Sequence, residues 1–412
     1  MSSPGATQHA GRGLALCLGV ALALALINLP VGLSGDLDGY FVAEKAAAWG
    51  AQGWAPSRGW GFPAYEAAIY PLVYWFGPWA GKLYALAHYL GAVALFYGLA
   101  LRVQRERPPS VPRAVAATLA LVAVPIVIIS GNTLLETSQG LFWGLAALSV
   151  ASRYLERPSV GHLVALALAL GVATATRLDA VLLAAAIALT LWRYARPTLG
   201  QAAVAVALFA LSGLAPYALY REAWRTATVV LPDPLGQRAL RAGVGVVQVL
   251  GPLGWAALVG VGWWRWRHGL RPPPGAWEWL FGVAVALYGL RFVLLPDELE
   301  YLILLVPLLL LVCTQRGWTT RQLATLAVAL CCANLFQVYV LAADVDGARH
   351  LALGISPGAI WQDRTARLRL DYVYSTLPTQ FDELAAQYGA SEYSTLPSEQ
   401  EGALVIIPRD QT

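Results

Sequence analysis

The stretch that decides the fold is 161–192, GHLVALALALGVATATRLDAVLLAAAIALTLW. Two apolar runs flank a short polar turn, Thr176-Arg177-Leu178-Asp179. Each run is shorter than the roughly 20 residues that cross a bilayer comfortably, whereas a single continuous span would be too long. We therefore expect a hairpin of two short spans, with Arg177 and Asp179 in a recess below the outer membrane surface.

The rest of the chain is comparably apolar. Of its 412 residues, 58% are hydrophobic and 13% are charged, and the mean hydropathy is +0.57. Soluble proteins carry roughly 25% charged residues. This composition excludes a soluble enzyme and a protein with a single membrane anchor, and the net charge of +4 does not indicate a nucleic-acid partner. We predict an all-α polytopic membrane protein.

About eleven apolar runs are predicted to span the membrane. They lie near 14–33, 80–101, 112–130, 134–152, 161–176, 179–192, 201–220, 245–264, 276–292, 299–315 and 320–341. Arginines fall in every second connection, as expected for connections that face the cytoplasm. This pattern places the N-terminus in the cytoplasm and the C-terminus outside.

Two segments of the predicted outer side are less apolar than the spans and are expected to fold outside the hydrocarbon core. In the first outer loop, 34–79, the segment 38–49 (DGYFVAEKAAAW) is predicted to form an amphipathic helix that lies along the membrane surface. This loop belongs to a transmembrane domain at 1–341. Residues 342–412 are more polar and are predicted to form a small extracytoplasmic α/β cap, with a helix at 381–388 and a strand at 403–407.

Ionisable side chains at the membrane are costly, so each is a candidate functional residue. The sharpest motif is Asp36-Leu37-Asp38, directly after the first span. Two carboxylates at this spacing can share a divalent cation, or one can act as a general base that the other positions. The alternative is structural, because an aspartate at position 38 can simply cap the helix that follows.

These features together resemble the GT-C superfamily of integral-membrane glycosyltransferases, including its mannosyltransferases and aminoarabinose transferases. In that superfamily the first outer loop opens with acidic residues and an aromatic, as Asp36, Asp38 and Tyr40 do here. The resemblance covers about residues 14–315. Its other elements are the segment 56–66 (PSRGWGFPAYE), Glu136, the turn 176–179, Arg291, Tyr301 and Pro307. Gly39 departs from the pattern, since many relatives have an acid there, which leaves open whether Asp36 or Asp38 is the base.

The resemblance implies an inverting transfer of a sugar from a polyprenyl-phosphate donor to a lipid, glycan or protein acceptor. It also implies a bacterial or archaeal plasma membrane, with the reaction on its outer face. The implied catalytic residues are Asp38, Asp36 and Glu136. The cations expected to bind the donor phosphate are Arg177, Arg58, Lys45 and Arg291, and Asp179, Tyr40, Glu66 and Tyr301 are expected to line the site. Members of the superfamily differ in metal dependence, so a divalent cation on Asp36 and Asp38 stays open.

Several of these residues have structural alternatives. Arg177 can close the hairpin through an ion pair with Asp179, a role compatible with phosphate binding. Glu136 can cap a helix or lie in a solvated turn, and Arg291 can extend its side chain toward the membrane surface.

The alternative class of function is a polytopic transporter or lipid flippase with an outward-facing charged cavity. Such proteins often contain internal repeats and polar sites near the membrane midplane. We find no repeat between the two halves of this sequence, and its charges gather toward one face. The pattern therefore favours the transferase.

Overall fold

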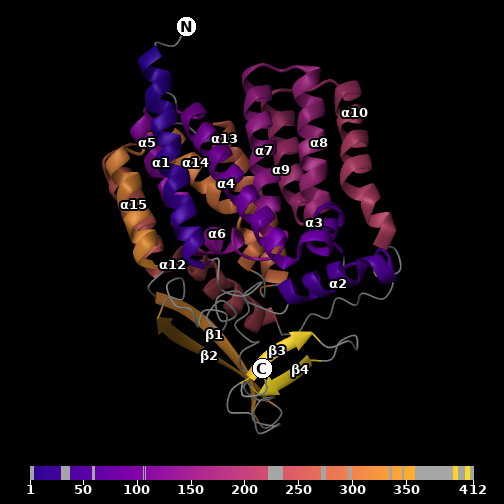
Figure 1. Cartoon of the computed structure of the whole chain (residues 1–412). Coiled ribbons are helices and arrows are strands. Elements are labelled where there is room, and N and C mark those ends of the chain that lie inside the picture. Colours follow the sequence, from indigo (N-terminus) through magenta and orange to yellow (C-terminus); the bar gives the residue numbers. More distant parts are fainter. Residues whose placement is uncertain are drawn as a thin grey trace.

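The computed structural model describes residues 4–28, 38–57, 61–104, 106, 108–220, 235–270, 275–294, 296, 299–333, 336–345, 348–357, 393–397 and 404–408. Helices account for most of this chain, and Figure 1 shows many of them running side by side in a bundle.

Helix boundaries follow local signals in the sequence. The side chains of Ser110, Ser159 and Thr198 each accept a hydrogen bond from the backbone of the first helical turn, and so cap α5, α8 and α10. The helices are α1 (Pro4–Asn28), α2 (Asp38–Gln52), α3 (Pro63–Phe76), α4 (Pro78–Arg102), α5 (Val111–Val122), α6 (Pro125–Ser130), α7 (Thr137–Glu156), α8 (Val160–Thr176), α9 (Ala180–Tyr194), α10 (Leu199–Phe209), α12 (Leu235–Arg267), α13 (Ala276–Leu294), α14 (Leu305–Gln315) and α15 (Thr320–Ala333). Shorter helical segments are the π-helix η1 (Ala210–Leu214) and the 3-10 helices η2 (Ala215–Tyr220) and η3 (Leu299–Leu302).

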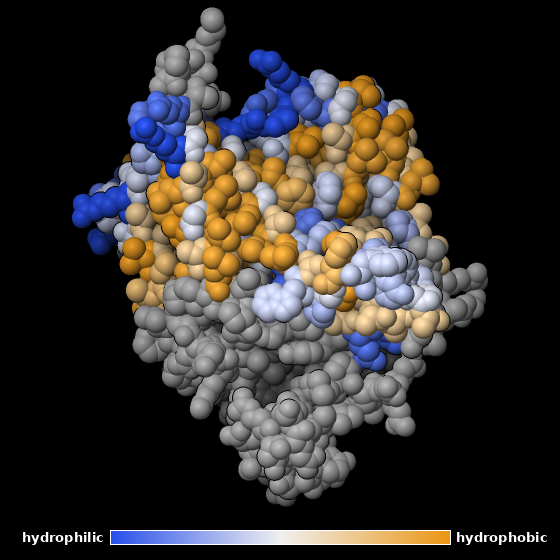
Figure 2. Space-filling view, in the orientation of Figure 1, coloured by the Kyte–Doolittle hydropathy of each residue, from blue (hydrophilic) through white to orange (hydrophobic). Residues whose placement is uncertain are grey.

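The apolar helices identify an integral membrane protein. Five helices of the described chain are long and apolar enough to cross a membrane, at Gln8–Leu26, Pro78–Arg102, Leu199–Ala218, Arg238–Arg267 and Ala276–Leu294. Shorter apolar helices lie at Val111–Val122, Val160–Thr176, Ala180–Tyr194, Leu299–Gln315 and Thr320–Ala333. Figure 2 shows hydrophobic side chains over the middle of the bundle and hydrophilic ones gathered at its upper end. The count of eleven spans and their orientation remain predictions.

The helix break predicted at 176–179 is confirmed. Helix α8 ends at Thr176 with Arg177 as its C-cap residue, and α9 begins at Ala180 with Asp179 as its N-cap residue. Beyond α9, α10 lies against α8, and its continuation η1 approaches α8 closely. A Cβ atom on Gly213 of η1 would lie 3.0 Å from the Cα of Gly171.

The first outer loop is more helical than expected. The helix predicted at 38–49 is present as α2, which runs across the lower end of the bundle in Figure 1. A second helix, α3, occupies 63–76, a part of the loop for which no helix had been predicted. Pro63 at its first position suits a helix start, and the helix ends at Gly77, whose φ of 78° is favourable for glycine. Val42 and Ala46 of α2 pack with Tyr65 and Ile69 of α3 in a small buried cluster, which holds α2 in place.

The end of the helical part was predicted too far along the chain. We expected a span at 320–341, but α15 ends at Ala333, and Phe336–Val345 forms strand β1. The sequence FQVYVL that opens β1 is rich in β-branched and aromatic residues, which favour strands. Strand β1 pairs antiparallel with β2 (Ala348–Pro357), and β3 (Tyr393–Pro397) pairs with β4 (Leu404–Pro408).

The predicted C-terminal cap is only partly described. The strand expected at 403–407 corresponds to β4. The helix expected at 381–388 lies outside the described residues. The division into domains at residue 341 therefore stays a prediction.

Candidate functional site

Four helix ends meet at one buried ion cluster, which we call the Arg177 cluster: Arg177, Glu136, Asp179 and Glu300. Glu136 is the N-cap residue of α7, Arg177 the C-cap residue of α8 and Asp179 the N-cap residue of α9. Glu300 comes from η3, 123 residues further along the chain than Arg177. The α8–α9 hairpin thus brings Arg177 and Asp179 together with the carboxylates of two other elements, α7 and η3.

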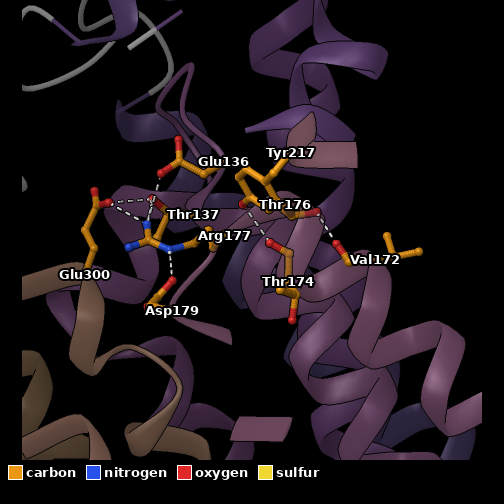
Figure 3. Close-up of polar contacts among 9 residues, drawn as sticks. All are labelled: Glu136, Thr137, Val172, Thr174, Thr176, Arg177, Asp179, Tyr217 and Glu300. Atoms are coloured by element: carbon orange, nitrogen blue, oxygen red, sulfur yellow. Dashed lines mark hydrogen bonds and ion pairs between the residues drawn. The ribbon is translucent and has the colours of Figure 1, made fainter. Parts of the chain in front are cut away.

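The guanidinium group of Arg177 lies among the three carboxylates (Figure 3). Its Nη1 atom is 2.9 Å from Oε2 of Glu300 and 3.1 Å from Oε1 of Glu136, and its Nε atom is 3.1 Å from Oδ1 of Asp179. Thr137 donates a hydrogen bond of 2.9 Å to the same oxygen of Glu300. Gly140 of α7 makes room for the arginine, because a Cβ atom there would lie 2.8 Å from the Cδ of Arg177.

Burial makes this cluster unusual. The side chain of Arg177 is 5% exposed, and those of Glu136, Asp179 and Glu300 are 3%, 8% and 8% exposed. The helix dipoles favour the arrangement, since carboxylates lie at the N-terminal ends of α7 and α9 and the arginine at the C-terminal end of α8. The four groups together are formally anionic, which favours further cations close by.

A second arginine and an aromatic ring extend the Arg177 cluster. The guanidinium of Arg291, in the last turn of α13, lies 4.2 Å from the ring centre of Tyr301. The guanidinium of Arg177 lies 5.6 Å from the same ring. The structure therefore brings together five residues that were expected in the site: Arg177, Asp179, Glu136, Arg291 and Tyr301.

Glu66, another predicted site residue, lies in a separate hydrogen-bonded group. Its fully buried carboxylate accepts hydrogen bonds from the backbone N–H and hydroxyl of Ser57, at 2.7 and 2.6 Å, and from the hydroxyl of Tyr220. The indole of Trp54 donates to the Tyr220 oxygen at 2.6 Å. This network fastens η2 to α3 and to the loop before it.

Tyr217 connects the two groups. Its hydroxyl donates a 2.8 Å hydrogen bond to the carbonyl of Thr174, in the last turn of α8. Helix η2, which carries Tyr217 and Tyr220, thus bonds both to the last turn of α8 beside Arg177 and to Glu66 of the second group.

Lys82 and Glu300 are charged residues that the sequence analysis did not assign to the site. Lys82, in the first turns of α4, is 2% exposed, and its ammonium lies 5.2 Å from the ring centre of Trp79. The sequence alone could have drawn attention to Lys82, because the chain has two lysines, Lys45 and Lys82, and Lys82 lies inside an apolar run. For Glu300 the signal was an acidic group at 297–300, directly before an apolar run.

The remaining predicted residues are only partly described. Asp36 and Arg58 lie outside the described residues, and for Asp38 and Tyr40 only the helical backbone of α2 is described. Lys45 lies on α2, half-buried. Within the described part of the chain, no group of three His, Cys, Asp or Glu residues is arranged to hold a metal ion. Metal binding by Asp36 and Asp38 is therefore untested.

Two solved structures share this fold. ArnT from Cupriavidus metallidurans in the apo state is 17% identical over 73% of this chain and 59% of that chain, with a TM-score of 0.53. ArnT bound to undecaprenyl phosphate is 18% identical over 76% of this chain and 60% of that chain, with a TM-score of 0.52. The matched region is thus less than two thirds of ArnT. ArnT is a GT-C structure, so the likeness confirms the predicted resemblance at the level of the fold. No protein-family model and no curated protein matches the chain.

Proposed function

We propose that this protein is an inverting glycosyltransferase that moves a sugar from a polyprenyl-phosphate donor to a lipid, glycan or protein acceptor. The observation that carries the proposal is the buried Arg177 cluster, placed where helix ends meet in a fold shared with ArnT. One ArnT structure contains undecaprenyl phosphate, which is a lipid carrier of the kind that the proposed donor requires. The reaction is assigned to the predicted outer face of the membrane.

Asp38 is the proposed general base, with Asp36 as its neighbour and Glu136 as the second candidate. Helix α2 begins at Asp38, and a helix N-terminus stabilises the ionised form of a carboxylate. An ionised carboxylate can take the proton of the attacking acceptor group, whereas the neutral acid cannot. The helix-cap role and the base role of Asp38 are compatible with each other.

The surroundings of Arg177 suggest a different division of roles among the cations. We had expected Arg177 to bind the donor phosphate, but three carboxylates lie against it and repel a second anion. We therefore assign Arg177 to holding the acids and helix ends in position. We assign the donor phosphate to Arg291, which shares the ring of Tyr301 with Arg177, and to Lys82 as a second candidate chosen for its burial in α4, since ammonium and guanidinium groups both bind phosphate. Arg58 and Lys45 remain further candidates for the same role.

The decisive assay separates donor binding from transfer. Purified protein in detergent is given synthetic short-chain polyprenyl-phosphate sugars with a radiolabelled sugar, together with extracted membrane lipids and glycans as acceptors. Asp38→Asn is expected to bind the donor normally but to lose about 10²–10⁴-fold in the rate of transfer. Lys82→Gln is expected to weaken the binding of undecaprenyl phosphate. Arg102→Gln, at the other end of α4, is the matched control and should change neither property.

Two outcomes would contradict the proposal. A folded Asp36→Asn/Asp38→Asn double mutant with full activity would show that these acids only cap the helix. Wild-type protein that binds undecaprenyl phosphate tightly but transfers none of the sugars would favour the transporter class instead.

A further inference from the structure

A basic pocket lies far from the Arg177 cluster, where α9 ends. It has a volume of about 840 Å³ and is lined by Leu189, Trp192, Arg193, Tyr194, Arg196, Pro197 and Trp279. Helix α9 begins next to the Arg177 cluster and has 15 residues, which places the pocket about 22 Å away along the helix axis. In the predicted orientation, this end of α9 faces the cytoplasm.

The two arginines of the pocket are held in place by different means. The guanidinium of Arg193 lies 4.4 Å from the ring centre of Trp279 on α13 and 5.6 Å from that of Tyr194. Arg196 has a φ of 49°, a left-handed conformation that is uncommon for residues other than glycine. Its backbone N–H donates a 2.9 Å hydrogen bond to the carbonyl of Leu191. This hydrogen bond closes the C-terminal turn of α9, which places Arg196 directly after the helix end.

The pocket offers positive charge without an acid to balance it. None of the residues that line it is acidic, and the described ion pairs include neither Arg193 nor Arg196. Glu278, next to Trp279 in the chain, is turned elsewhere, because its carboxylate pairs with Arg316 at 3.2 Å and accepts a hydrogen bond from the N–H of Gly275. The pocket is therefore complementary to an anion.

An apolar groove adjoins the pocket and shares two of its residues, Trp192 and Pro197. The groove lies between α8, α9 and α10, has a volume of about 390 Å³, and is lined by apolar side chains that include Leu166, Ala205 and Phe209. None of the residues of α10 is buried. A charged pocket that continues into an apolar groove matches the headgroup and acyl chain of a lipid better than it matches a free inorganic anion.

We propose that this combined site binds an anionic phospholipid, with the phosphate at Arg193 and Arg196 and an acyl chain in the groove between α8, α9 and α10. Exposed Trp192, Tyr194 and Trp279 suit the membrane–water interface, where tryptophan and tyrosine are enriched. Basic pockets between helices on the cytoplasmic side are typical sites for acidic lipid headgroups. The site is separate from the proposed donor site and does not depend on the proposed transferase activity.

Native mass spectrometry of the full-length protein tests this site with two lipids of different charge. Wild-type protein is expected to retain phosphatidylglycerol in preference to phosphatidylcholine. Arg193→Gln/Arg196→Gln should weaken phosphatidylglycerol binding by about 30-fold, because each basic residue contributes a factor of about five near an anionic surface. Arg153→Gln/Arg157→Gln removes the same charge from exposed positions at the end of α7 and should leave the affinity unchanged.

A second variant tests the groove without a change of charge. Ala205→Trp fills the groove and is also expected to weaken phosphatidylglycerol binding, while inorganic phosphate at millimolar concentration should fail to displace the lipid. Equal retention of the two lipids, or equal affinity in the two double mutants, would overturn the proposal. Displacement by inorganic phosphate, or full affinity in Ala205→Trp, would contradict the proposal as well, because the site would then recognise a phosphate without an acyl chain in the groove.

Discussion

Replacement of Arg177 by methionine should remove the cation that three buried carboxylates share. Methionine keeps an unbranched apolar stem beside Gly140 but has no group to pair with Glu136, Asp179 or Glu300. Removing one partner from a buried ion pair typically costs about 3–5 kcal/mol, because the other charge is left in a poor solvent environment. Three contacts of 2.9–3.1 Å on side chains that are at most 8% exposed place Arg177→Met in this range.

Two further variants show how much of the expected destabilisation comes from the buried charges. Arg316→Met removes an arginine that is 39% exposed and pairs with Glu278 at 3.2 Å. Glu278 is 7% exposed but keeps the hydrogen bond from the N–H of Gly275, so the expected cost is smaller than for Arg177→Met, about 1–3 kcal/mol. Adding Glu300→Gln to Arg177→Met removes one of the uncompensated carboxylates. The double mutant should therefore be more stable than Arg177→Met alone, by about 1–3 kcal/mol.

The measurement is the free energy of unfolding in mixed micelles, from titration with a denaturing detergent and tryptophan fluorescence. All variants are compared with the wild type in the same micelles. A loss for Arg177→Met no larger than for Arg316→Met would refute the reasoning, and so would an unchanged stability on adding Glu300→Gln. Either result would mean that the carboxylates of the cluster are not charged, or that water reaches them.

Other parts of the structure give predictions of the same kind. Glu66→Gln should lower the free energy of unfolding by about 1.5–3 kcal/mol, because a charged acceptor of three hydrogen bonds is lost; an unchanged value would mean that the network is not structural. Gly81→Ala should also destabilise the protein, since its Cβ atom would lie 2.1 Å from Leu134, and Leu134→Ala should relieve the loss in a double mutant that shows coupling. Cysteines placed at Ser110 and Ser391 should be labelled from opposite sides of the membrane; labelling of Ser391→Cys from the cytoplasm alone would reverse the predicted orientation.

Much of the site could be predicted because charge inside apolar sequence is conspicuous. Arg177 and Asp179 break a run that is otherwise apolar, and the break itself sets the ends of α8 and α9. Glu136 stands out for the same reason at the start of α7. That these groups share one cluster with Glu300 could not be predicted, because the packing of helices distant in sequence decides which helix ends meet.

The errors also have physical causes. Helix α3 was not predicted, because the outer loop 34–79 is rich in Trp, Tyr, Gly and Pro; proline at the helix start and a buried contact with α2 nevertheless support a helix at 63–76. The span predicted to end at 341 was too long, because hydropathy does not distinguish the apolar helix α15 from the apolar strand β1. Lys82 was overlooked because the small number of lysines beside many arginines was attributed to the base composition of the genome and not to a chemical role.

The contact between Gly171 and Gly213 has a mechanical consequence for α10. Helices in lipid are not pressed together by the hydrophobic effect, so they adhere mainly through short-range packing of small residues. A Cβ atom on Gly171 would lie 1.8 Å from the hydroxyl of Ser212. Helix α8 and the segment η1 therefore approach each other so closely that there is no room for a side chain at Gly171. Along the rest of its length, α10 borders the apolar groove that it lines together with α8 and α9. A methyl group at Gly171 or Gly213 would therefore push η1 away from α8 and weaken the packing that joins α10 and η1 to the bundle.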